Sequence, residues 1–217
     1  MIQLDGIKAV IFDFDGLMVE SESIAHQVLS DVLGKYGKNI TYDIYQNLIG
    51  REPLESIDYL IDVLDLPLMQ LEFFETYWLE RTERMCHEVI PMPGLIDLMQ
   101  FLTDRGIVMG VASNSPLRYV HEVLEAIDLS EFFDCVRCRE DVEQGKPAPD
   151  LYLATATCLE VEHTHCLALE DSPIGLQAAL NAGMRCIVVP NEDLESEDFS
   201  GAEGRFSSLN EVFAALS

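Results

Sequence analysis

The sequence predicts an α/β protein whose core is a doubly wound parallel sheet and which carries an inserted helical domain. Three observations support this prediction. Short apolar segments typical of buried strands alternate with amphipathic helical segments over the second half of the chain. Several of these apolar segments end in a polar or charged residue. Finally, about seventy residues near the N-terminus show no strand pattern, and this length exceeds an ordinary connection between a strand and a helix.

The first strand is predicted in the apolar segment that begins at Lys8 and runs into Asp13-Phe14-Asp15-Gly16. A continuously apolar segment is typical of a strand that is buried on both faces of a parallel sheet. Asp13 and Asp15 therefore lie at its carboxyl end, where ligands bind in open α/β sheets. Two neighbouring carboxylates repel each other, so they either form a turn before Gly16 or belong to a functional site.

The insertion is predicted to form a helical cap domain of residues 17–87, which leaves residues 1–16 and 88–217 for the core. Four helices are expected in the cap, at about residues 21–36, 43–48, 54–64 and 69–87. In the last of these helices, a stripe of side chains at helical spacing is expected to face the cap's own core, namely Leu71, Phe74, Trp78 and Leu79.

The second half of the chain is predicted to supply the rest of the core. Strands are expected at residues 107–112, 133–138, 166–169 and 185–189, and helices at residues 95–105, 116–127, 150–158, 174–182 and 209–216. Proline in the first turn of a helix and glycine just past its end support several of these boundaries. Residues 191–204 are acidic and rich in glycine, which predicts a surface loop.

Three further polar motifs accompany the Asp13-x-Asp15 pair. They are Ser113-Asn114 after an apolar segment, Lys146-Pro147 in a Gly/Pro loop, and Glu170-Asp171-Ser172 after another apolar segment. In this order the four motifs resemble the signature motifs of the haloacid dehalogenase-like (HAD) hydrolase superfamily. The segments DFDGLMVESE, GKPAPD and LALEDSPIGLQAALNAGM are most similar to its sugar-phosphate phosphatases and β-phosphoglucomutases. The resemblance covers nearly the whole chain and implies a Rossmann-like core with a cap.

The motif residues predict a phosphatase that works through an aspartyl-phosphate. Asp13 is the candidate nucleophile, because a carboxylate that attacks phosphorus divides one difficult displacement into two easier ones. Asp15 is suited to protonate the leaving oxygen and then to activate water. Ser113, Asn114 and the amides at the start of the next helix are candidates for binding phosphate oxygens. Lys146 is expected to supply a fixed positive charge.

The resemblance also implies a Mg²⁺ site, formed by the carboxylates of Asp13, Glu170 and Asp171 and by the main-chain carbonyl of Asp15. Hard oxygen ligands of this kind suit Mg²⁺. The four carboxylates, Lys146 and a phosphate dianion together carry a net charge of about −5, and one Mg²⁺ ion reduces this to about −3. Substrate is therefore expected to bind poorly without the metal, and a chelator is expected to inhibit the enzyme.

Two other functions remain open beside hydrolysis of small phosphate monoesters such as sugar phosphates. The first is a β-phosphoglucomutase-like mutase. Such mutases carry a histidine in the first cap helix, where this sequence has Ala25, and His26 is rotated by about 100° from that position. The second is a non-catalytic sensor of a phosphorylated ligand, against which the intact Asp13 and Asp15 argue.

Substrate selection is expected to depend on the cap, as the resemblance implies. Glu22 and Arg51 are the candidate substrate-binding residues there. Arg51 is the only arginine in the first half of the cap, and a surface ion pair is its alternative role.

Composition limits the partners and the compartment of the protein. The 217 residues include 39 acidic and 13 basic ones, and the resulting net charge of −26 argues against nucleic acid or anionic membrane as a partner. No signal-peptide pattern or membrane-spanning apolar segment is evident, so we expect a cytoplasmic monomer or weak homo-oligomer that binds a small phosphate ester. The six cysteines include a Cys135-x-x-Cys138 pair that could bind zinc, but free thiols are the expectation in a reducing compartment.

Overall fold

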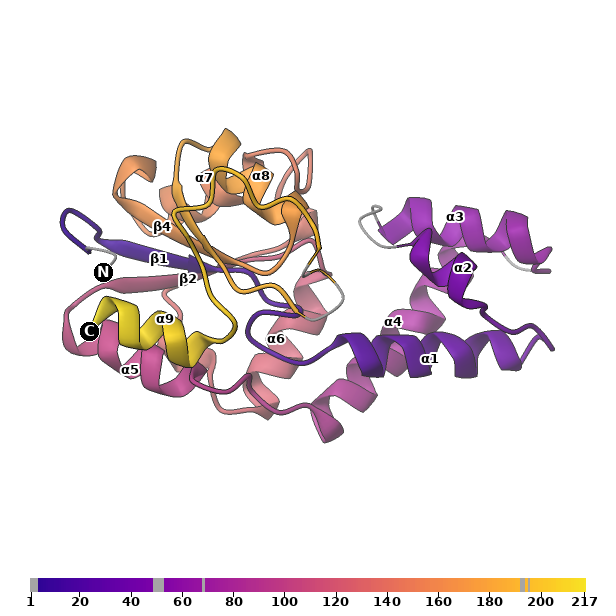
Figure 1. Cartoon of the computed structure of the whole chain (residues 1–217). Coiled ribbons are helices and arrows are strands. Elements are labelled where there is room, and N and C mark those ends of the chain that lie inside the picture. The colour runs from indigo at the N-terminus through magenta and orange to yellow at the C-terminus, as the bar shows by residue number, and fades with distance from the viewer. Residues whose placement is uncertain (1–3, 49–52, 68, 192–193, 195) are drawn as a thin grey trace. The chain divides into compact units, whose positions relative to one another are not determined.

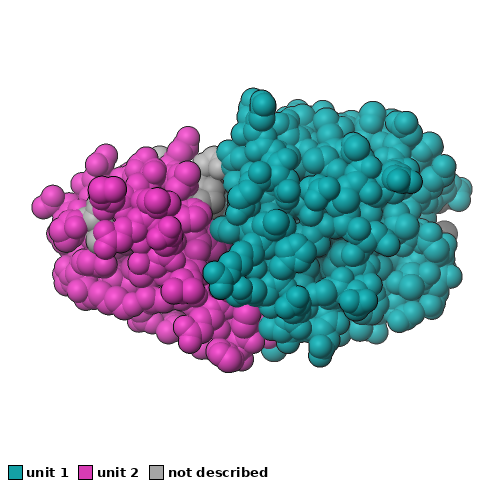
Figure 2. All heavy atoms as spheres, turned by 180° about the vertical axis from the view of Figure 1, so that it is seen from behind, with its two compact units in different colours: residues 1–20, 90–217 teal, residues 21–89 magenta. Residues whose placement is uncertain are grey.

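A computed structural model describes residues 4–48, 53–67, 69–191, 194 and 196–217. The chain divides into two compact units, which Figure 2 distinguishes by colour. The core unit comprises residues 1–20 and 90–217, and the cap unit comprises residues 21–89. The junctions predicted from the sequence, 16/17 and 87/88, lie a few residues before the junctions between these units.

The core unit is built on a parallel sheet, which has six strands within the described residues, in the order β3-β2-β1-β4-β5-β6. The strands are β1 (Ala9–Phe12), β2 (Val108–Ala112), β3 (Cys135–Arg137), β4 (Cys166–Glu170), β5 (Arg185–Val188) and β6 (Gly204–Arg205). Central strand β1 pairs with β2 on one side and with β4 on the other. The strand order therefore reverses beside β1, and ligands bind in α/β sheets at the carboxyl ends of strands that flank such a point.

Helices cover both faces of this sheet, so the predicted doubly wound fold is confirmed (Figure 1). One face carries α7 (Asp150–Cys158) and α8 (Pro173–Asn181), and the other carries α5 (Leu95–Asp104) and α9 (Leu209–Leu216). The remaining connections contain α6 (Leu117–Ala126) and the short 3-10 helices η1 (Ser130–Phe132), η2 (Arg139–Asp141) and η3 (His163–His165). The five α-helices among these begin and end within one or two residues of the predicted positions, and the three 3-10 helices were not predicted.

Strand β1 is fully buried along its whole length. Its side chains alternate between the two faces of the sheet. Ala9 and Ile11 belong to one apolar cluster with Leu151 and Tyr152 of α7, and Val10 and Phe12 face the opposite layer of helices. Since neither face of the strand reaches water, polar residues can appear only where the strand ends.

The prediction that residues 191–204 form only a surface loop is wrong at its end. Gly204 and Arg205 form the short strand β6, which pairs in parallel with Ile187 and Val188 of β5. Two main-chain bonds flank this pairing, from Glu203 N to Cys186 O (2.7 Å) and from Phe206 N to Val188 O (2.9 Å). A two-residue edge strand has too few side chains to show alternation, so the acidic composition of the segment concealed it.

The prediction that all six cysteines are free thiols is also wrong. A disulfide joins Cys135 of β3 to Cys158 at the end of α7. Among the described residues, Cys86, Cys138, Cys166 and Cys186 are free. The bonded pair is 23 residues apart in the sequence, and only the packing of α7 against β3 brings the two sulfur atoms together.

Within the described residues, the regular secondary structure of the cap unit is entirely helical. Its helices are α1 (Glu22–Gly34), α2 (Tyr42–Gln46), α3 (Pro53–Leu64) and α4 (Gln70–Glu88). Long helix α4 packs against both α1 and α3. The apolar residues of α1 that this packing buries are Ile24, Val28, Leu29, Val32 and Leu33. An ion pair at the surface also joins the two helices, between Arg84 Nη2 and Asp31 Oδ2 at 2.8 Å.

The predicted core stripe of α4 is only partly right. Trp78 is 8% exposed, whereas the side chains of Leu71 and Leu79 are 59% and 60% exposed. The buried stripe of this helix consists instead of Phe73, Trp78, Thr82 and Met85. Apolar residues occupy two faces of α4, and sequence spacing did not reveal which face packs. None of the described helices combines the length and hydropathy that a membrane span requires.

Candidate active site

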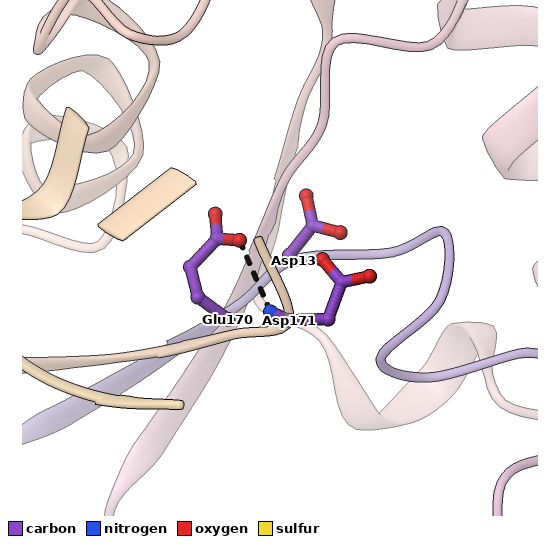
Figure 3. A group of neighbouring side chains, drawn as sticks. All are labelled: Asp13, Glu170 and Asp171. Carbon is purple, nitrogen blue, oxygen red and sulfur yellow. Dashed lines mark hydrogen bonds between the residues drawn. The ribbon is translucent and has the colours of Figure 1, made fainter. Parts of the chain in front are cut away.

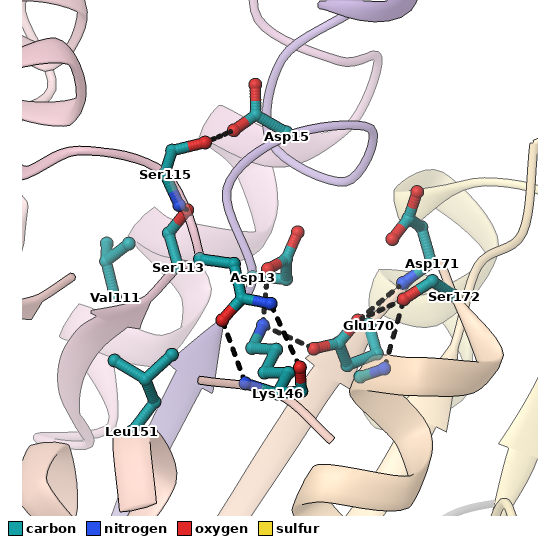
Figure 4. Close-up of polar contacts among 12 residues, drawn as sticks. Asp13, Asp15, Val111, Ser113, Ser115, Lys146, Leu151, Glu170, Asp171 and Ser172 are labelled. Carbon is teal, nitrogen blue, oxygen red and sulfur yellow. Dashed lines mark hydrogen bonds and ion pairs between the residues drawn. The ribbon is translucent and has the colours of Figure 1, made fainter. Parts of the chain in front are cut away.

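The predicted motif residues of the core unit meet at one edge of the sheet, at the carboxyl ends of its central strands. Asp13 directly follows β1, Ser113 directly follows β2, and Glu170 is the last residue of β4. Asp171 comes next along the chain from Glu170. Lys146 lies on the loop before α7, and its side chain reaches the same edge (Figure 4).

The ammonium group of Lys146 is the centre of this group of residues. Its Nζ pairs with Asp13 Oδ1 and also with Glu170 Oε1, the latter at 2.6 Å. All three side chains are buried, and the ammonium also lies 5.0 Å from the centre of the Tyr152 ring. A buried cation between two buried carboxylates is a compact arrangement in which each charge is compensated by another.

The side-chain amide of Asn114 holds the main chain of Lys146 in place. Asn114 Nδ2 donates to Lys146 O (3.2 Å), and Asn114 Oδ1 accepts from Lys146 N (2.8 Å). Asn114 is predicted to be a phosphate ligand, but its side-chain amide already uses both of its ends to position the loop. Among the described contacts, the main-chain N–H of Asn114 donates no hydrogen bond, so this group is the part of the residue that could bind phosphate.

The other predicted phosphate donors are partly occupied. Ser113 Oγ accepts a bond from the main-chain N–H of Ser115 (3.0 Å), which leaves its hydroxyl hydrogen available as a donor. The first N–H of α6, that of Leu117, donates to both oxygens of Glu140, at 3.2 and 3.0 Å. A carboxylate already caps this helix, so the donors for a phosphate are concentrated at Ser113 and Asn114.

Glu170 is completely buried, and both of its oxygens accept hydrogen bonds. Tyr152 Oη donates to Oε1 at 2.6 Å, and the Asp171 N–H and the Ser172 hydroxyl donate to Oε2 at 3.3 and 3.4 Å. The carboxylate lies directly over Gly175, in the first turn of α8, where a β-carbon would come within 1.9 Å of it. Glu170 is therefore fixed in one orientation, toward Lys146.

The pKa values of Asp13 and Lys146 are both raised by their buried surroundings. Burial raises the pKa of Asp13 to about 7, because the opposing charge of Lys146 only partly offsets desolvation and because Glu170 and Asp15 repel the ionised form. Burial alone would lower the pKa of Lys146, but the charges of Asp13 and Glu170 outweigh it and raise that pKa above its usual value. Near neutral pH the lysine is therefore protonated.

A cluster of carboxylates at this edge could hold a metal ion. One oxygen each from Asp13, Glu170 and Asp171 lies within 4.8 Å of the others, and all three residues are buried (Figure 3). Asp171 approaches the main chain at Gly16 so closely that a β-carbon there would lie 2.2 Å from Asp171 Oδ2. Buried carboxylate oxygens at this spacing fit a hard divalent cation such as Mg²⁺.

Two hydroxyl groups that the sequence analysis missed hold the second aspartate. Ser115 Oγ donates to Asp15 Oδ2 at 2.6 Å, and Tyr119 Oη donates to Asp15 Oδ1 at 2.8 Å. Figure 4 shows the Asp15–Ser115 pair apart from the group around Lys146. The position of Ser115 directly after the Ser113-Asn114 motif was a usable signal. Tyr119 lies on the apolar side of α6, where it resembles an ordinary core residue.

Of the two substrate residues predicted in the cap unit, only Glu22 is among the described residues. Arg51 lies outside the described residues. Glu22 is exposed, and its Oε2 accepts a hydrogen bond from Tyr45 Oη at 2.8 Å. Burial, together with the charge of Glu22, raises the pKa of Tyr45, whose ring packs edge-on against His26. Glu22 and Tyr45 thus form a hydrogen-bonded pair within the cap unit.

Comparison with known proteins gives consistent matches over nearly the whole chain. The sequence profile of the haloacid dehalogenase-like hydrolases matches residues 10–189. Hexitol phosphatase B of Escherichia coli (strain K12) is 32% identical over 218 residues, which cover 96% of this chain and 95% of that protein. A phosphorylated carbohydrates phosphatase of Thermotoga maritima is 30% identical over 182 residues, covering 83% of this chain and 84% of that protein.

A solved structure is similar in fold. The crystal structure of CbbY from Rhodobacter sphaeroides in complex with phosphate has a TM-score of 0.88 and 28% sequence identity to this chain. The match covers 95% of this chain and 96% of that one.

Proposed function

This chain belongs to the haloacid dehalogenase-like hydrolases, and we propose that it hydrolyses small phosphate monoesters, sugar phosphates among them, with Asp13 as the nucleophile. The observation that carries the proposal is the pairing of Asp13 with Lys146 at the edge of the sheet where Ser113, Glu170 and Asp171 also meet. The named relatives support the substrate class, because one acts on hexitol phosphates and another on phosphorylated carbohydrates.

In the first step, Asp13 attacks the phosphorus atom of the ester. A bond forms between an Asp13 carboxylate oxygen and phosphorus, while the bond between phosphorus and the sugar oxygen breaks. The electron pair of the broken bond takes a proton from Asp15, which acts as the general acid. The alcohol leaves, and the phosphoryl group remains on Asp13 as an aspartyl-phosphate.

In the second step, Asp15 acts as the general base. It takes a proton from a water molecule, whose oxygen attacks phosphorus as the bond to Asp13 breaks. Inorganic phosphate leaves and both aspartates return to their starting protonation states. The same group thus serves as acid and then as base, as the two halves of the reaction require.

Lys146 has two tasks in this mechanism. Its positive charge favours the ionised form of Asp13, which is the nucleophilic form, and counteracts the effect of burial on that carboxylate. The same charge attracts the phosphate dianion. Lys146 is restrained by its ion pair with Glu170, whose carboxylate Tyr152 holds, and by the Asn114 amide, which binds the main chain of Lys146. Its ammonium group is therefore held in place before substrate arrives.

Asp13, Glu170 and Asp171, together with the main-chain carbonyl of Asp15, would hold the Mg²⁺ ion that the family implies. When bound, the ion neutralises negative charge on the carboxylates and on the phosphoryl oxygens. This contribution matters here because the site concentrates carboxylates in a protein of strongly negative net charge.

Water is the proposed acceptor of the phosphoryl group. Ala25 stands where the mutases of this family carry a histidine, and the neighbouring His26 packs against Tyr45. Transfer back to a sugar therefore lacks that group. Glu22 and Arg51 of the cap unit remain the proposed contacts for the substrate.

A panel assay tests the proposal. Phosphate release is measured from hexose, hexitol and glycerol phosphates and from p-nitrophenyl phosphate, with Mg²⁺ and with EDTA, for the wild type and for Asp13→Asn. We expect Mg²⁺-dependent release from the wild type and a loss of at least ~10⁴-fold in the variant, since covalent catalysis needs the carboxylate. Failure of the folded wild type to release phosphate from any ester would refute the proposal.

A further inference from the structure

Both carboxylate oxygens of Asp15 are engaged by hydroxyl groups from the segment that follows β2. Ser115 binds Oδ2 and Tyr119 binds Oδ1, at 2.6 and 2.8 Å. One donor on each oxygen restricts rotation of the carboxylate about its bond to Cβ, because a rotation would break both bonds at once. These contacts connect Asp15, which follows β1, with the segment that follows β2.

The position of the Tyr119 hydroxyl is set by packing. The side chain is 1% exposed, and its ring packs edge-on against Phe14, with 5.8 Å between ring centres and an angle of 86° between planes. Phe14 lies between the two aspartates in the sequence. Tyr119 therefore packs against Phe14, the residue before Asp15, and also donates a hydrogen bond to the Asp15 carboxylate. These two interactions together fix the position of the Asp15 carboxylate.

Ser115 connects the same carboxylate to the phosphate-binding residues. Its hydroxyl binds Asp15, and its main-chain N–H binds the Ser113 hydroxyl oxygen at 3.0 Å. The carboxylate is thus held relative to Ser113, which is one of the two candidate phosphate donors. A general acid acts on the leaving oxygen, which lies across the phosphorus from the nucleophile.

We propose that Tyr119, assisted by Ser115, is a positioning residue that orients Asp15 for proton transfer to the leaving oxygen. The inference rests on the proposed phosphatase function. Proton transfer requires donor and acceptor to come within about 2.6–3.2 Å, so a carboxylate that can rotate freely would spend less time in reach. Tyr119 acts through its hydrogen bond to Asp15 and has no contact with the substrate in this mechanism.

Leaving-group dependence distinguishes this role from simple packing. A sugar alcohol is a poor leaving group and needs its proton during bond breaking, whereas p-nitrophenolate leaves without one. The ratio kcat/KM reports the steps up to formation of the aspartyl-phosphate. A disturbed general acid should therefore lower kcat/KM for a sugar phosphate and spare p-nitrophenyl phosphate, while a general structural defect should lower both alike.

The test compares Tyr119→Phe with the wild type on the most active sugar phosphate of the panel and on p-nitrophenyl phosphate. We expect a roughly tenfold fall in kcat/KM for the sugar phosphate and a change within about twofold for the aryl ester, because only part of a general-acid contribution of 10²–10⁴-fold is lost. The phenylalanine ring retains the packing against Phe14. Tyr36→Phe, at a half-buried tyrosine after α1, is the matched control and should change neither value.

Two further variants test the same positioning role. Asp15→Asn should show the same selectivity with a larger loss for the sugar phosphate. Ser115→Ala removes the hydroxyl but keeps the main-chain bond to Ser113, and it should resemble Tyr119→Phe. Equal losses on both esters, no loss in Tyr119→Phe, or a gain on the sugar phosphate would each overturn the positioning role. Failure of the wild type itself to release phosphate from either ester would overturn the proposed function, and the inference with it.

Discussion

Replacement of Gly175 by alanine tests the buried arrangement around Lys146 most directly. Gly175 lies in the first turn of α8, and an added β-carbon would come within 1.9 Å of both the carboxyl carbon and Oε2 of Glu170. Ordinary contact begins at 3.4 Å, so one group must move by more than an ångström. Glu170 has no exposed surface and no room to retreat without separating from Lys146 or Tyr152.

Two opposing effects determine the expected stability. Alanine in a helix is favoured over glycine by about 1 kcal/mol. Overpacking a buried site costs about 1–3 kcal/mol, and separating a buried carboxylate from its cation costs about 3–5 kcal/mol. The unfavourable effects are larger, so we expect Gly175→Ala to lower the free energy of unfolding by about 2 kcal/mol or more. A displaced Lys146 should lower kcat/KM by roughly 10²-fold.

The matched control is Gly34→Ala, because Gly34 is the last residue of α1 and a β-carbon there would meet no atom within 4 Å. This variant should be as stable as the wild type or slightly more stable, and it should keep full activity. Stability is measured by urea unfolding followed by circular dichroism, and activity by phosphate release. If Gly175→Ala matches the wild type in both measurements, the close contact between Glu170 and α8 does not exist in solution, and the reasoning fails.

Three other predictions concern charge, protons and thiols. Lys146→Met leaves Asp13 and Glu170 without their buried cation, so metal-free protein should lose about 3–5 kcal/mol of stability by urea unfolding, and added Mg²⁺ should restore part of it. The pKa of Asp13 is raised to about 7, and Mg²⁺ binds the ionised carboxylate. The affinity for Mg²⁺, measured by calorimetry, should therefore fall by about tenfold per pH unit below pH 7 and level off above pH 8. Unfolded, unreduced protein should show four reactive thiols in a colorimetric titration, and six after reduction.

A specific result would contradict each of these three predictions. A Lys146→Met protein as stable as the wild type without metal would mean that the buried carboxylates do not need the ammonium group. Mg²⁺ affinity that stays constant between pH 5.5 and 8.5 would contradict the raised pKa of Asp13. Six thiols in the unreduced, unfolded protein would show that Cys135 and Cys158 are not bonded in solution.

The fold could be predicted from the sequence because local patterns carry it. Continuous apolar segments indicate strands buried on both faces, and their alternation with amphipathic helices leaves a parallel sheet as the natural arrangement. The boundaries of α7 and α9 were predicted at the residues where these helices begin and end. Short edge strand β6 was missed because two residues produce no periodic pattern. The packed face of α4 was missed because apolar residues occupy two faces of that helix.

The sequence by itself determined which residues gather at the site. Asp13, Ser113 and Glu170 each stand where a buried strand ends, and parallel strands must end at the same edge of their sheet. The resemblance of these motifs to those of the haloacid dehalogenase-like hydrolases already implied phosphoryl transfer. No tertiary contact was needed for that step, because strand position follows from apolar patterning alone.

Only the tertiary structure decided how these side chains are used. It pairs Lys146 with both Asp13 and Glu170, turns the Asn114 amide toward the lysine main chain, and brings Tyr119 to Asp15. Such contacts join side chains from elements far apart in the sequence, and they depend on rotamers and on packing to within an ångström. A buried tyrosine looks the same in sequence whether its hydroxyl binds a catalytic carboxylate or a main-chain carbonyl, so only the folded arrangement distinguishes the two.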